Sequence, residues 1–442
     1  MPPAYPRSPR RNGVHYANAA MTVLLGLGSN LGDRCDNMEK AIEALAGLPG
    51  TSLLRWSTVY ESNALLAPDS PPMWDKPFLN AAVELSTSLK PLDLLAATQA
   101  IEKRLGRVEG ERWAPRTIDV DLLAYDDETI TTPELVVPHV GVRERAFVLA
   151  PLAEIVPSRR LPGTSETVLQ LKRRIDDSLP AWMGVVNVTP DSFSDGGRWL
   201  KDDKPTTAQL ELLDGNYIDI GGESTRPGAV DVDSETEWRR VAPVLEYLDQ
   251  HFSGRLLRPK ISIDTRSPTT AARAIEAGVS IVNDVSGFAN RAMIEILAGS
   301  RCDLVLMHNL SVPADPSNVL PHDCDPLAVL RSWFGEHLEI LERAGIARER
   351  VIIDPGIGFG KSAIQSLEII DRARELMEFD CRVLFGHSRK SYLESMTKVP
   401  PSERDPETVA VSANLARRGV EILRVHALDL HRRFWRVYQR TA

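Results

Sequence analysis

The 442-residue sequence is poor in cysteine, in long apolar runs and in positive charge. Its cysteines, Cys35, Cys302, Cys324 and Cys381, are scattered and form no CxxC pair, which gives no zinc site and favours reduced thiols in a cytosol. No apolar run approaches the roughly 18 residues of a membrane span. With a net charge of −9, the chain is not expected to bind nucleic acid, and any phosphate site must come from local arginine, lysine or backbone N–H groups.

The remaining composition is that of an ordinary globular protein, with 43% hydrophobic and 26% charged residues. At about 150 residues per domain, the length predicts two or three domains. Residues 1–20 are rich in proline and arginine and lack an apolar core, so we expect a disordered leader rather than a secretory signal. Met21 stands directly before a predicted strand and could be the natural start. We expect a cytoplasmic protein, and organelle targeting by the short leader is the alternative.

The larger half of the chain repeats one pattern, a short apolar run that ends in polar residues. The first run, within Met183–Gly197, leads into Asn187, Thr189 and Asp191, and amphipathic helical stretches separate most of the later runs. Eight such runs predict a parallel (β/α)8 TIM barrel over residues 181–442, with its active site at the carboxyl ends of the strands. One such polar residue would be an ordinary turn or helix cap, but eight in register favour a site. The runs are Met183–Val188, Tyr217–Gly221, Lys260–Asp264, Ile281–Val285, Asp303–Met307, Val351–Asp354, Arg382–Gly386 and Ile422–Val425.

The first half predicts a smaller domain over residues 21–157, with strands and helices in βαββαβ order. This order is typical of an α+β ferredoxin-like fold. Residues 158–180 form a short, partly helical linker, so we expect the two domains to pack closely. The expected strands are Thr22–Leu27, Leu53–Glu61, Phe78–Ser86 and Ile118–Tyr125, and the helices Asn37–Ala46 and Pro91–Leu105.

The chemistry of the first half concentrates in Gly106–Asp121, GRVEGERWAPRTIDVD. Asp119 and Asp121 stand at i and i+2 on a strand, so both carboxylates point to one face. Two adjacent acids need a cation, and hard oxygen ligands suit Mg²⁺. Trp113 offers a flat face for a heterocycle. A surface salt-bridge cluster is the alternative for the arginines of this segment, which could otherwise hold a triphosphate: Arg107, Arg112 and Arg116.

Four segments, GLGSNLGDR, FLNAAVEL, ERWAPRTIDVDLL and VPHVGVRERAFVLAPLAEI, make residues 22–157 resemble the 6-hydroxymethyl-7,8-dihydropterin pyrophosphokinases. The resemblance implies that Asp119 and Asp121 hold two Mg²⁺ ions between ATP and the pterin, and that Arg107 and Arg116 act with them in catalysis. It also implies phosphate contacts from Arg107, Arg112, Arg116, His139 and Arg145, and pterin contacts from Ser62, Leu65, Asn80, Trp113 and Phe147.

The barrel half resembles the dihydropteroate synthases over residues 180–442, through NVTPDSFSDGG, DIGGESTRPG, SIDT, NDVSG, DPGIGFGK, GHSRK and RVHAL. The resemblance implies that Asn187 binds one Mg²⁺ on the pyrophosphate and that Lys390 is catalytic. The implied pterin contacts are Asp219, Asp264, Asn283, Asp354 and Lys390. The implied pyrophosphate contacts are Asn187, Thr225, Arg226, Arg424 and His426, and the implied p-aminobenzoate contacts are Phe193, Pro227 and Ser388.

The residue types fit this ligand, because a pterin presents an edge of alternating donors and acceptors that carboxylates and amides read in pairs. Asp264, Asn283 and Asp354 could supply such groups from three strand ends. For one of these acids alone, a helix cap would be the better interpretation, and for Lys390 a solvated surface charge. The nearby PGIGFGKS differs from a Walker A loop because Pro355 has no N–H to give a phosphate.

Two segments depart from the synthase pattern. Asn309-Leu310-Ser311-Val312 replaces the usual Met-Gln-Gly-Thr, and we expect the loop that follows to be mobile or to pack on the first domain. Gly215-Asn216-Tyr217 replaces Gly-Ala-Asp before the second barrel strand, which we interpret as a change in packing.

The sequence therefore predicts a two-step enzyme whose partners are ATP, 6-hydroxymethyl-7,8-dihydropterin and p-aminobenzoate. The first step releases AMP, and the second gives 7,8-dihydropteroate. A homodimer through the barrel is compatible with this interpretation. The alternatives are a pterin-binding methyltransferase-type barrel and a non-catalytic pterin-binding protein.

Overall fold

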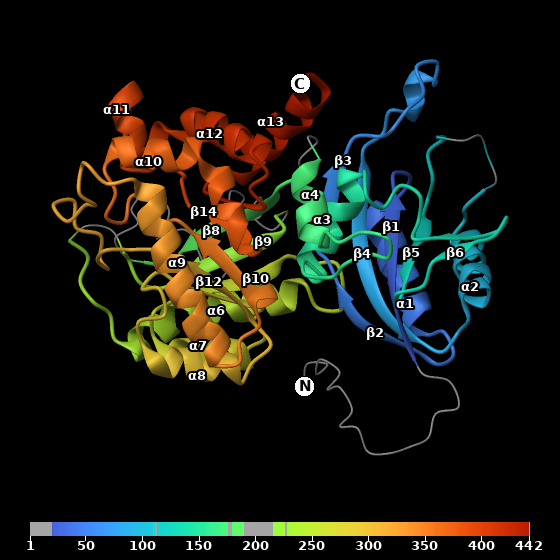
Figure 1. Cartoon of the computed structure of the whole chain (residues 1–442), viewed down its shortest axis with the longest axis horizontal. Helices are drawn as coiled ribbons and strands as arrows, with labels where there is room; N and C mark the ends of the chain where they lie inside the picture. Colours follow the sequence, from blue (N-terminus) through green and yellow to red (C-terminus); the bar gives the residue numbers. More distant parts are fainter. Residues whose placement is uncertain are drawn as a thin grey trace.

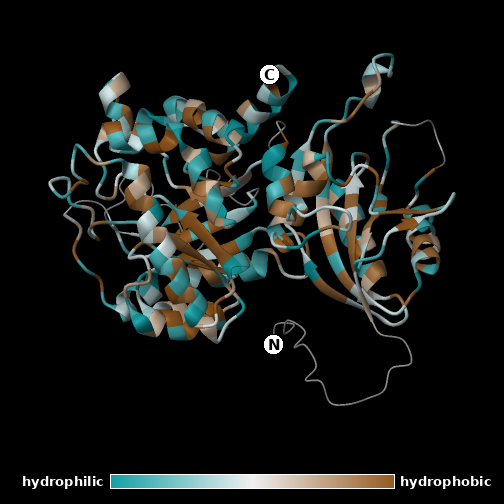
Figure 2. Ribbon diagram, viewed as in Figure 1, coloured by the Kyte–Doolittle hydropathy of each residue, from teal (hydrophilic) through white to brown (hydrophobic). Residues whose placement is uncertain are grey.

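The computed structural model describes residues 20–108, 110, 113–175, 179–189, 215–225 and 228–441. An antiparallel sheet with its helices lies beside a closed barrel of eight strands (Figure 1). Hydrophobic segments follow the strands in both parts, whereas the helices alternate between hydrophobic and hydrophilic positions (Figure 2). Within the described ranges, no helix is both long and apolar enough to cross a membrane. Apart from Ala20, the predicted leader lies outside those ranges.

The first sheet confirms the predicted ferredoxin-like order. Its strands run β2-β4-β1-β5, with the short β3 paired to β4, and all of these pairs are antiparallel. The elements are β1 (Met21–Ser29), α1 (Arg34–Ala46), β2 (Thr51–Trp56), β3 (Tyr60–Ser62), η1 (Pro72–Trp74), β4 (Phe78–Thr87), α2 (Pro91–Arg104), β5 (Asp119–Tyr125), β6 (Ile130–Thr131) and β7 (Val136–Val137).

The predicted strand Leu53–Glu61 is wrong as a single element, because the chain leaves the ladder between β2 and β3. The Ser57 hydroxyl accepts a hydrogen bond from the Ala82 N–H, and the N–H of Thr58 donates to Glu154 at 3.0 Å. A side-chain acceptor thus takes the place of a strand partner at Thr58.

The barrel confirms the prediction of eight parallel strands, which close in the order β10-β11-β12-β13-β14-β15-β8-β9. The strands are β8 (Ala181–Asn187), β9 (Tyr217–Gly221), β10 (Lys260–Asp264), β11 (Ile281–Asp284), β12 (Asp303–Met307), β13 (Val351–Asp354), β14 (Arg382–Phe385) and β15 (Ile422–Val425). The described helices around them are α6 (Ser234–His251), α7 (Pro268–Glu276), α8 (Arg291–Ala298), α9 (Pro326–Arg343), α10 (Ala363–Asp371), α11 (Glu394–Thr397), α12 (Asp405–Arg417) and α13 (Leu428–Thr441). Short 3₁₀ turns are η3 (Arg348–Arg350), η4 (Ala373–Phe379), η5 (Ser391–Leu393) and η6 (Pro401–Glu403).

Alternation along the barrel strands separates an apolar floor from a polar mouth. Inward residues near the amino ends of the strands form one buried apolar cluster. Two positions further on, the same face of several strands carries a polar residue that lines a cavity. Three such pairs are Ile281 with Asn283, Ile352 with Asp354 and Ile422 with Arg424.

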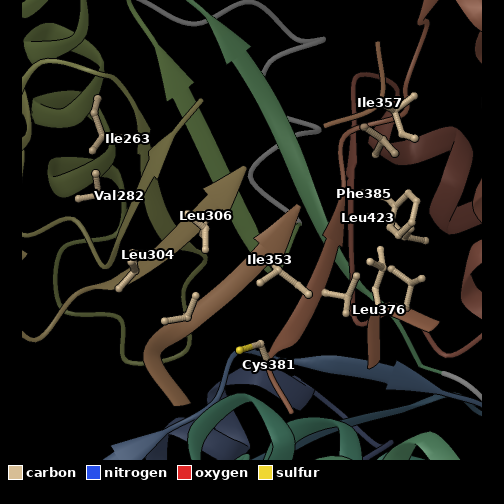
Figure 3. Packing of buried hydrophobic residues seen from close by; sticks show 14 of the residues in the cluster. Ile263, Val282, Leu304, Leu306, Ile353, Ile357, Leu376, Cys381, Phe385 and Leu423 are labelled. Atoms are coloured by element: carbon tan, nitrogen blue, oxygen red, sulfur yellow. The ribbon is translucent and has the colours of Figure 1, made fainter. Parts of the chain in front are cut away.

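The remaining strand residues pack against the surrounding helices in the main buried cluster. Figure 3 shows Leu304, Leu306 and Ile353 of this cluster, with Leu376 from the η4 turn nearby. Because both faces of each strand are thus occupied by side chains, the barrel is filled rather than hollow.

Helix α3 (Ala146–Ile155) lies between the two parts (Figure 1). Leu149 and Leu152 pack with the first sheet, whereas Ala146 and Ala150 belong to the apolar floor of the barrel. The following helix, α4 (Val168–Arg174), also packs with the sheet side of this helix. The floor of the barrel is therefore closed by a helix from the first half of the chain.

A buried carboxylate at the end of α3 joins the two parts. Glu154 accepts hydrogen bonds from the Thr58 hydroxyl at 2.7 Å and the Tyr60 hydroxyl at 2.9 Å. The same carboxylate pairs with Lys260 of β10 at 2.7 Å. The predicted change in packing at Asn216 has its cause here, because the Asn216 amide donates to the Thr58 hydroxyl at 2.9 Å.

We predict that Glu154→Ala lowers the free energy of unfolding by about 3 kcal/mol, because it leaves the Lys260 ammonium and the Thr58 donors without an acceptor. Tyr60→Phe removes only one hydroxyl donor to the same carboxylate and should cost about 1 kcal/mol. Urea unfolding of the full chain measures both changes. Equal midpoints for Glu154→Ala and the unaltered protein would show that this contact does not hold the two parts together.

Candidate functional sites

A first cavity of about 340 Å³ opens between β1, β4, β5 and the start of α3. Asp119 and Asp121 both line it, as their spacing on β5 predicts. Burial, and then the neighbouring charge of Asp119, raise the pKa of Asp121 above its usual range. Two carboxylates on one wall repel each other, so a nearby positive charge would stabilise them.

Two arginines meet that demand in this structure. Arg107 contacts Asp119 at 2.7 Å, and Arg116 donates to the same carboxylate at 2.9 and 3.0 Å. Arg107 also binds Glu102, which accepts the Val120 N–H at 2.8 Å and so stands fixed against β5. The arginine cluster is thus drawn toward the acid pair.

Asn30, the residue after β1, supports this site although it does not line the cavity. Its side-chain oxygen accepts the Arg116 N–H at 2.7 Å, and its own N–H donates to the Arg116 carbonyl at 3.1 Å. This closed pair fixes the backbone of Arg116 beside β1.

The opposite wall comes from the segment before α3. The Gly141 N–H donates to Nδ1 of His139 at 3.1 Å, which fixes the ring against this segment. Gly141 allows Arg145 to cross, since an added Cβ would lie 2.3 Å from the Arg145 Nε atom. The guanidinium carbon of Arg145 lies 5.8 Å from the centre of the Phe147 ring.

The remaining predicted pterin contacts also line this cavity. The Asn80 amide donates to the Ser62 hydroxyl at 2.9 Å and to the Tyr60 carbonyl at 3.1 Å, which leaves its oxygen as an acceptor. Leu65 and Trp113 complete the wall, and Trp113 has a left-handed backbone with φ of 75°. Arg107 is not part of the lining, and Arg112 lies outside the described residues.

A second cavity, of about 440 Å³, occupies the mouth of the barrel. Asp264 and Asp354, each the last residue of its strand, both line it. Burial and the adjacent Asp219 raise the pKa of Asp264 to about 7. Burial raises the pKa of Asp354 to about 6, although the Gly356 N–H and nearby cations oppose this shift. The mouth therefore holds two carboxyl groups that ionise near neutral pH.

Asp219 departs from the prediction that it contacts the pterin. It is fully buried and does not line the cavity. Its carboxylate accepts from the Asn283 amide at 3.1 Å and from the Arg424 guanidinium at 2.5 Å. Arg424 also donates to Asp264 at 2.8 Å. Because Asp219 stands two residues before the end of β9, it orients lining groups from below.

In the turn that follows β14, Ser388 and Lys390 face the cavity, whereas Arg389 points to helix α12. The Ser388 hydroxyl lies 2.9 Å from Nδ1 of His426, and both residues line the cavity. Arg389, with φ of 59°, binds Asp405 through two hydrogen bonds of 2.7 and 2.9 Å. This anchor turns Lys390 over the mouth, where its ammonium lies 4.4 Å from the centre of the Phe359 ring.

Sequence reasoning missed a buried pair beneath the same wall. The Lys361 ammonium lies 2.7 Å from Nδ1 of His308 and donates to the carbonyls of His308 and Phe359, both at 3.0 Å. Burial, together with the charge of Lys361, lowers the pKa of His308 to about 2, so the ring is neutral and can accept. The near-Walker motif thus uses its lysine to join two loops rather than to hold a phosphate.

The loop after His308 packs on the barrel mouth, which corrects the expectation that it packs on the first domain. Asn309 donates to the Val285 carbonyl at 2.9 Å, and the Ala314 N–H donates to the Thr225 carbonyl at 3.3 Å. Leu310 lies against Gly360, where φ is 74° and an added Cβ would come within 2.5 Å of the leucine side chain. The loop therefore supports the wall that carries Thr225.

Of the other predicted residues, Asn187, Thr225, Asn283 and Arg424 line the second cavity. Phe193, Arg226 and Pro227 lie outside the described residues. Within the described ranges, no group of three or more histidine, cysteine, aspartate or glutamate residues could hold a metal ion.

Two family models match the chain. The model of 7,8-dihydro-6-hydroxymethylpterin-pyrophosphokinase matches residues 24–157, and the model of pterin binding enzymes matches residues 183–426. The first match contains the first cavity, and the second contains the barrel strands and the mouth.

Similar proteins cover nearly the whole chain. The folate synthesis bifunctional protein of Chlamydia caviae is 36% identical over 94% of this chain and 97% of its own length. A mitochondrial folate synthesis bifunctional protein of Arabidopsis thaliana is 32% identical over 96% of this chain and 83% of its own length.

Solved structures match the barrel. The dihydropteroate synthase of Yersinia pestis, in a sulfonamide drug complex, is 34% identical with a TM-score of 0.55, covering 60% of this chain and 95% of that chain. The Xanthomonas albilineans dihydropteroate synthase with 4-aminobenzoic acid is 35% identical with a TM-score of 0.51. The match covers 59% of this chain and 92% of that chain.

These matches set aside both alternatives, the methyltransferase-type barrel and the non-catalytic pterin-binding protein. The first cavity, the barrel mouth and the full-length matches agree on one assignment. The chain belongs to the family of bifunctional folate-synthesis proteins, which join a 6-hydroxymethyl-7,8-dihydropterin pyrophosphokinase to a dihydropteroate synthase.

Proposed function

We propose that the chain catalyses two consecutive steps, one in each cavity, with residues 21–157 and 181–442 as the catalytic domains and 158–180 as the linker. In the first cavity, ATP pyrophosphorylates 6-hydroxymethyl-7,8-dihydropterin and AMP is released. In the second, the pterin pyrophosphate condenses with p-aminobenzoate to give 7,8-dihydropteroate and pyrophosphate. The observation that carries this proposal is the pairing of an acid pair and arginines in one cavity with ring-reading carboxylates in the other.

In the first step, the chain mainly positions the reactants and balances charge. Arg107 and Arg116 both contact Asp119 in this structure, so they stand where phosphate oxygens could replace the carboxylate as their partner. His139 and Arg145 face them across the cavity and would hold the other end of the triphosphate. The hydroxymethyl oxygen of the pterin would then attack the β-phosphorus in line with the departing AMP.

The pterin would lie between Trp113 and Phe147, whose rings offer apolar faces. The Asn80 oxygen, left as an acceptor by its bonds to Ser62 and Tyr60, would read a donor on the ring edge. Leu65 would close the apolar side. The hydrogen bonds that hold Asn80 are made within the chain, so this acceptor is oriented before the substrate arrives.

The residues present fit Mg²⁺, because the raised pKa of Asp121 reflects a buried acid pair that a divalent cation would relieve. We propose that Asp119 and Asp121 hold two ions with ATP, and that Asn187 holds one in the barrel mouth. When bound, Mg²⁺ neutralises phosphate charge in both steps. Phosphate oxygens would complete each coordination shell.

In the second cavity, Asp264, Asn283 and Asp354 would read the pterin edge, with Asp219 positioning Asn283. Lys390 would bind the ring carbonyl or N5 from above. A ring that donates to Asp264 would take the place of Arg424 as the donor to that carboxylate. The Arg424 guanidinium could then bind the pyrophosphate. Further pyrophosphate contacts would come from Asn187, Thr225, Arg226 and His426, and p-aminobenzoate contacts from Phe193, Pro227 and Ser388.

We also propose that the protein works in the cytoplasm and forms a homodimer through its barrel. Its four cysteines are free thiols, as a reducing compartment would keep them. Helix α13 carries the half-exposed Phe434 and the exposed Val437, an apolar face of the kind that subunits bury. Light scattering at several protein concentrations tests the dimer.

We predict that Asp121→Ala lowers AMP release by about a hundredfold or more, because the acid pair that holds the cation is lost. Synthase activity on preformed pterin pyrophosphate should stay unchanged, as should both activities of Glu134→Ala, an exposed acid of the same domain. The two products are assayed separately. A parallel loss of both activities in Asp121→Ala would mean unfolding rather than a catalytic role.

We predict that affinity of the barrel mouth for a pterin without phosphate falls as pH drops through the raised pKa values of Asp264 and Asp354, about 7 and 6. An ionised carboxylate accepts from the ring through both oxygens, whereas a protonated one loses part of that capacity and adds a competing O–H donor, so affinity is highest above about pH 7 and falls by up to tenfold per unit for each group that becomes protonated. Calorimetric titration between about pH 8 and 5 measures this. Asp264→Asn should remove the upper part of the dependence, and a flat profile in the unaltered protein would contradict the assignment.

We predict that Lys390→Ala weakens pterin-pyrophosphate binding to the barrel by roughly ten- to a hundredfold, because a charge-assisted hydrogen bond is worth about 1.5–3 kcal/mol. AMP release should not change. Lys103→Ala, at an exposed position of the first domain, is the matched loss of one positive charge. Titration of both variants decides, and unaltered affinity in Lys390→Ala would remove this residue from the site.

A further inference from the structure

A third cavity, of about 560 Å³, lies between the two domains and outside both sites described above. The first domain contributes the start of α1, strand β3 and Leu79. The barrel contributes Trp182, the segment after α6 and one face of α13. Its volume falls within the range of small-molecule sites.

Positive charge gathers on the walls of this cavity, although the chain carries a net charge of −9. Glu61 is the only carboxylate among the lining residues, and Arg34 and Arg436 share it, Arg34 at 3.3 Å. Arg34 also donates to the Pro77 carbonyl at 2.8 Å, and acids outside the lining pair with Arg255 (Glu39, 2.7 Å) and Arg258 (Asp249, 3.6 Å). Because each guanidinium carries five N–H groups, these contacts leave donors for a further anion. The lining arginines are Arg34, Arg255, Arg258, Arg432 and Arg436.

The apolar part of the wall contains a buried donor. Trp435 is 6% exposed, and its indole N–H has no hydrogen-bond partner among the described residues. Trp182 meets it edge-on, with ring centres 6.1 Å apart, and Phe252 lies in the same lining. The Trp435 N–H is covered and its ring stacks on Tyr438, with ring centres 5.2 Å apart, so it backs this wall rather than offering a contact. Phe252 beside the guanidinium groups suits a flat ring system that carries negative charge.

This cavity shares strands β3 and β4 with the pyrophosphokinase cavity. Glu61 and Leu79, which pair across these strands, line the third cavity. Their chain neighbours Ser62, Phe78 and Asn80 line the first cavity. Because successive residues of a strand face opposite sides, a ligand that moves Glu61 or Leu79 acts on the pterin-facing residues directly.

We infer that the inter-domain cavity binds a small organic polyanion with a flat ring system, and that its occupancy changes the pterin affinity of the first cavity. The second clause rests on the proposed function of that cavity. Two kinds of molecule share this chemistry, a nucleotide with phosphate groups and a pteroyl compound with carboxylates. Both present acceptors to the arginines and a flat ring to the apolar wall that carries Phe252.

Calorimetric titration of the full chain with AMP and, separately, with pteroylglutamate tests the inference. We expect one of the two probes to bind the inter-domain cavity, and Arg436→Ala should raise the Kd of that probe by about tenfold or more. Arg433→Ala, an exposed arginine of the same helix that pairs with Asp429, should not. Glu61→Gln should strengthen the same event, because it removes the carboxylate that competes for Arg34 and Arg436. The probe that responds identifies the phosphate or the carboxylate source.

The coupling is measured as the change in the KM for the pterin that the responding probe causes, which should be larger in the unaltered protein than in Arg436→Ala; for AMP, its effect as a product at the first cavity remains in both. A purely structural role of the Arg34–Glu61–Arg436 contact would instead lower the unfolding midpoint in both variants and change no binding event. If neither probe gives an event that responds to Arg436, the inference is wrong. AMP release that still requires Asp121 would leave the proposed function standing in that case.

Discussion

The two-sided burial of helix α3 is the constraint on which the arrangement of both sites depends. Its leucines fill the sheet side, and Ala146 and Ala150 meet the barrel floor, where larger side chains would not fit against a closed layer. Arg145 and Phe147, at the start of the helix, line the first cavity. Glu154, at its end, binds Lys260 of the barrel. One helix thus positions part of the first site and anchors it to the second domain.

This attachment places the two cavities at different ends of the barrel. The first domain covers the amino ends of the strands, whereas the second cavity lies at their carboxyl ends. The space between is filled by inward residues such as Met183, Tyr217 and Val305, which are buried against one another. Among the described residues, these side chains fill the barrel axis between the two cavities.

The alternation of side chains along each strand, and the position at which each strand ends, made the residues of the barrel mouth largely predictable. Contacts between residues far apart in the sequence could not be predicted. Asp264 and Asp354 end their strands and line the mouth, as expected, whereas Asp219 stands two residues earlier and is covered by its neighbours. Its place within the strand was a signal that could have separated them. Asn216 shows the limit, because its partner Thr58 lies 158 residues away and no local pattern reveals such a pair.

The charges at the barrel mouth explain why ring and phosphate should bind together. Arg424 is divided between Asp219 and Asp264, and the pKa of Asp264 remains raised to about 7 despite that contact. One guanidinium thus serves two carboxylates, so Asp264 keeps acceptor capacity that this contact does not fill. A ligand that only accepts would compete with Asp264 for Arg424, and one that only donates would leave the guanidinium unmatched. A molecule with donors at one end and an anion at the other suits both groups. Its donors can bind Asp264 in place of Arg424, and its anion can then bind the guanidinium of Arg424.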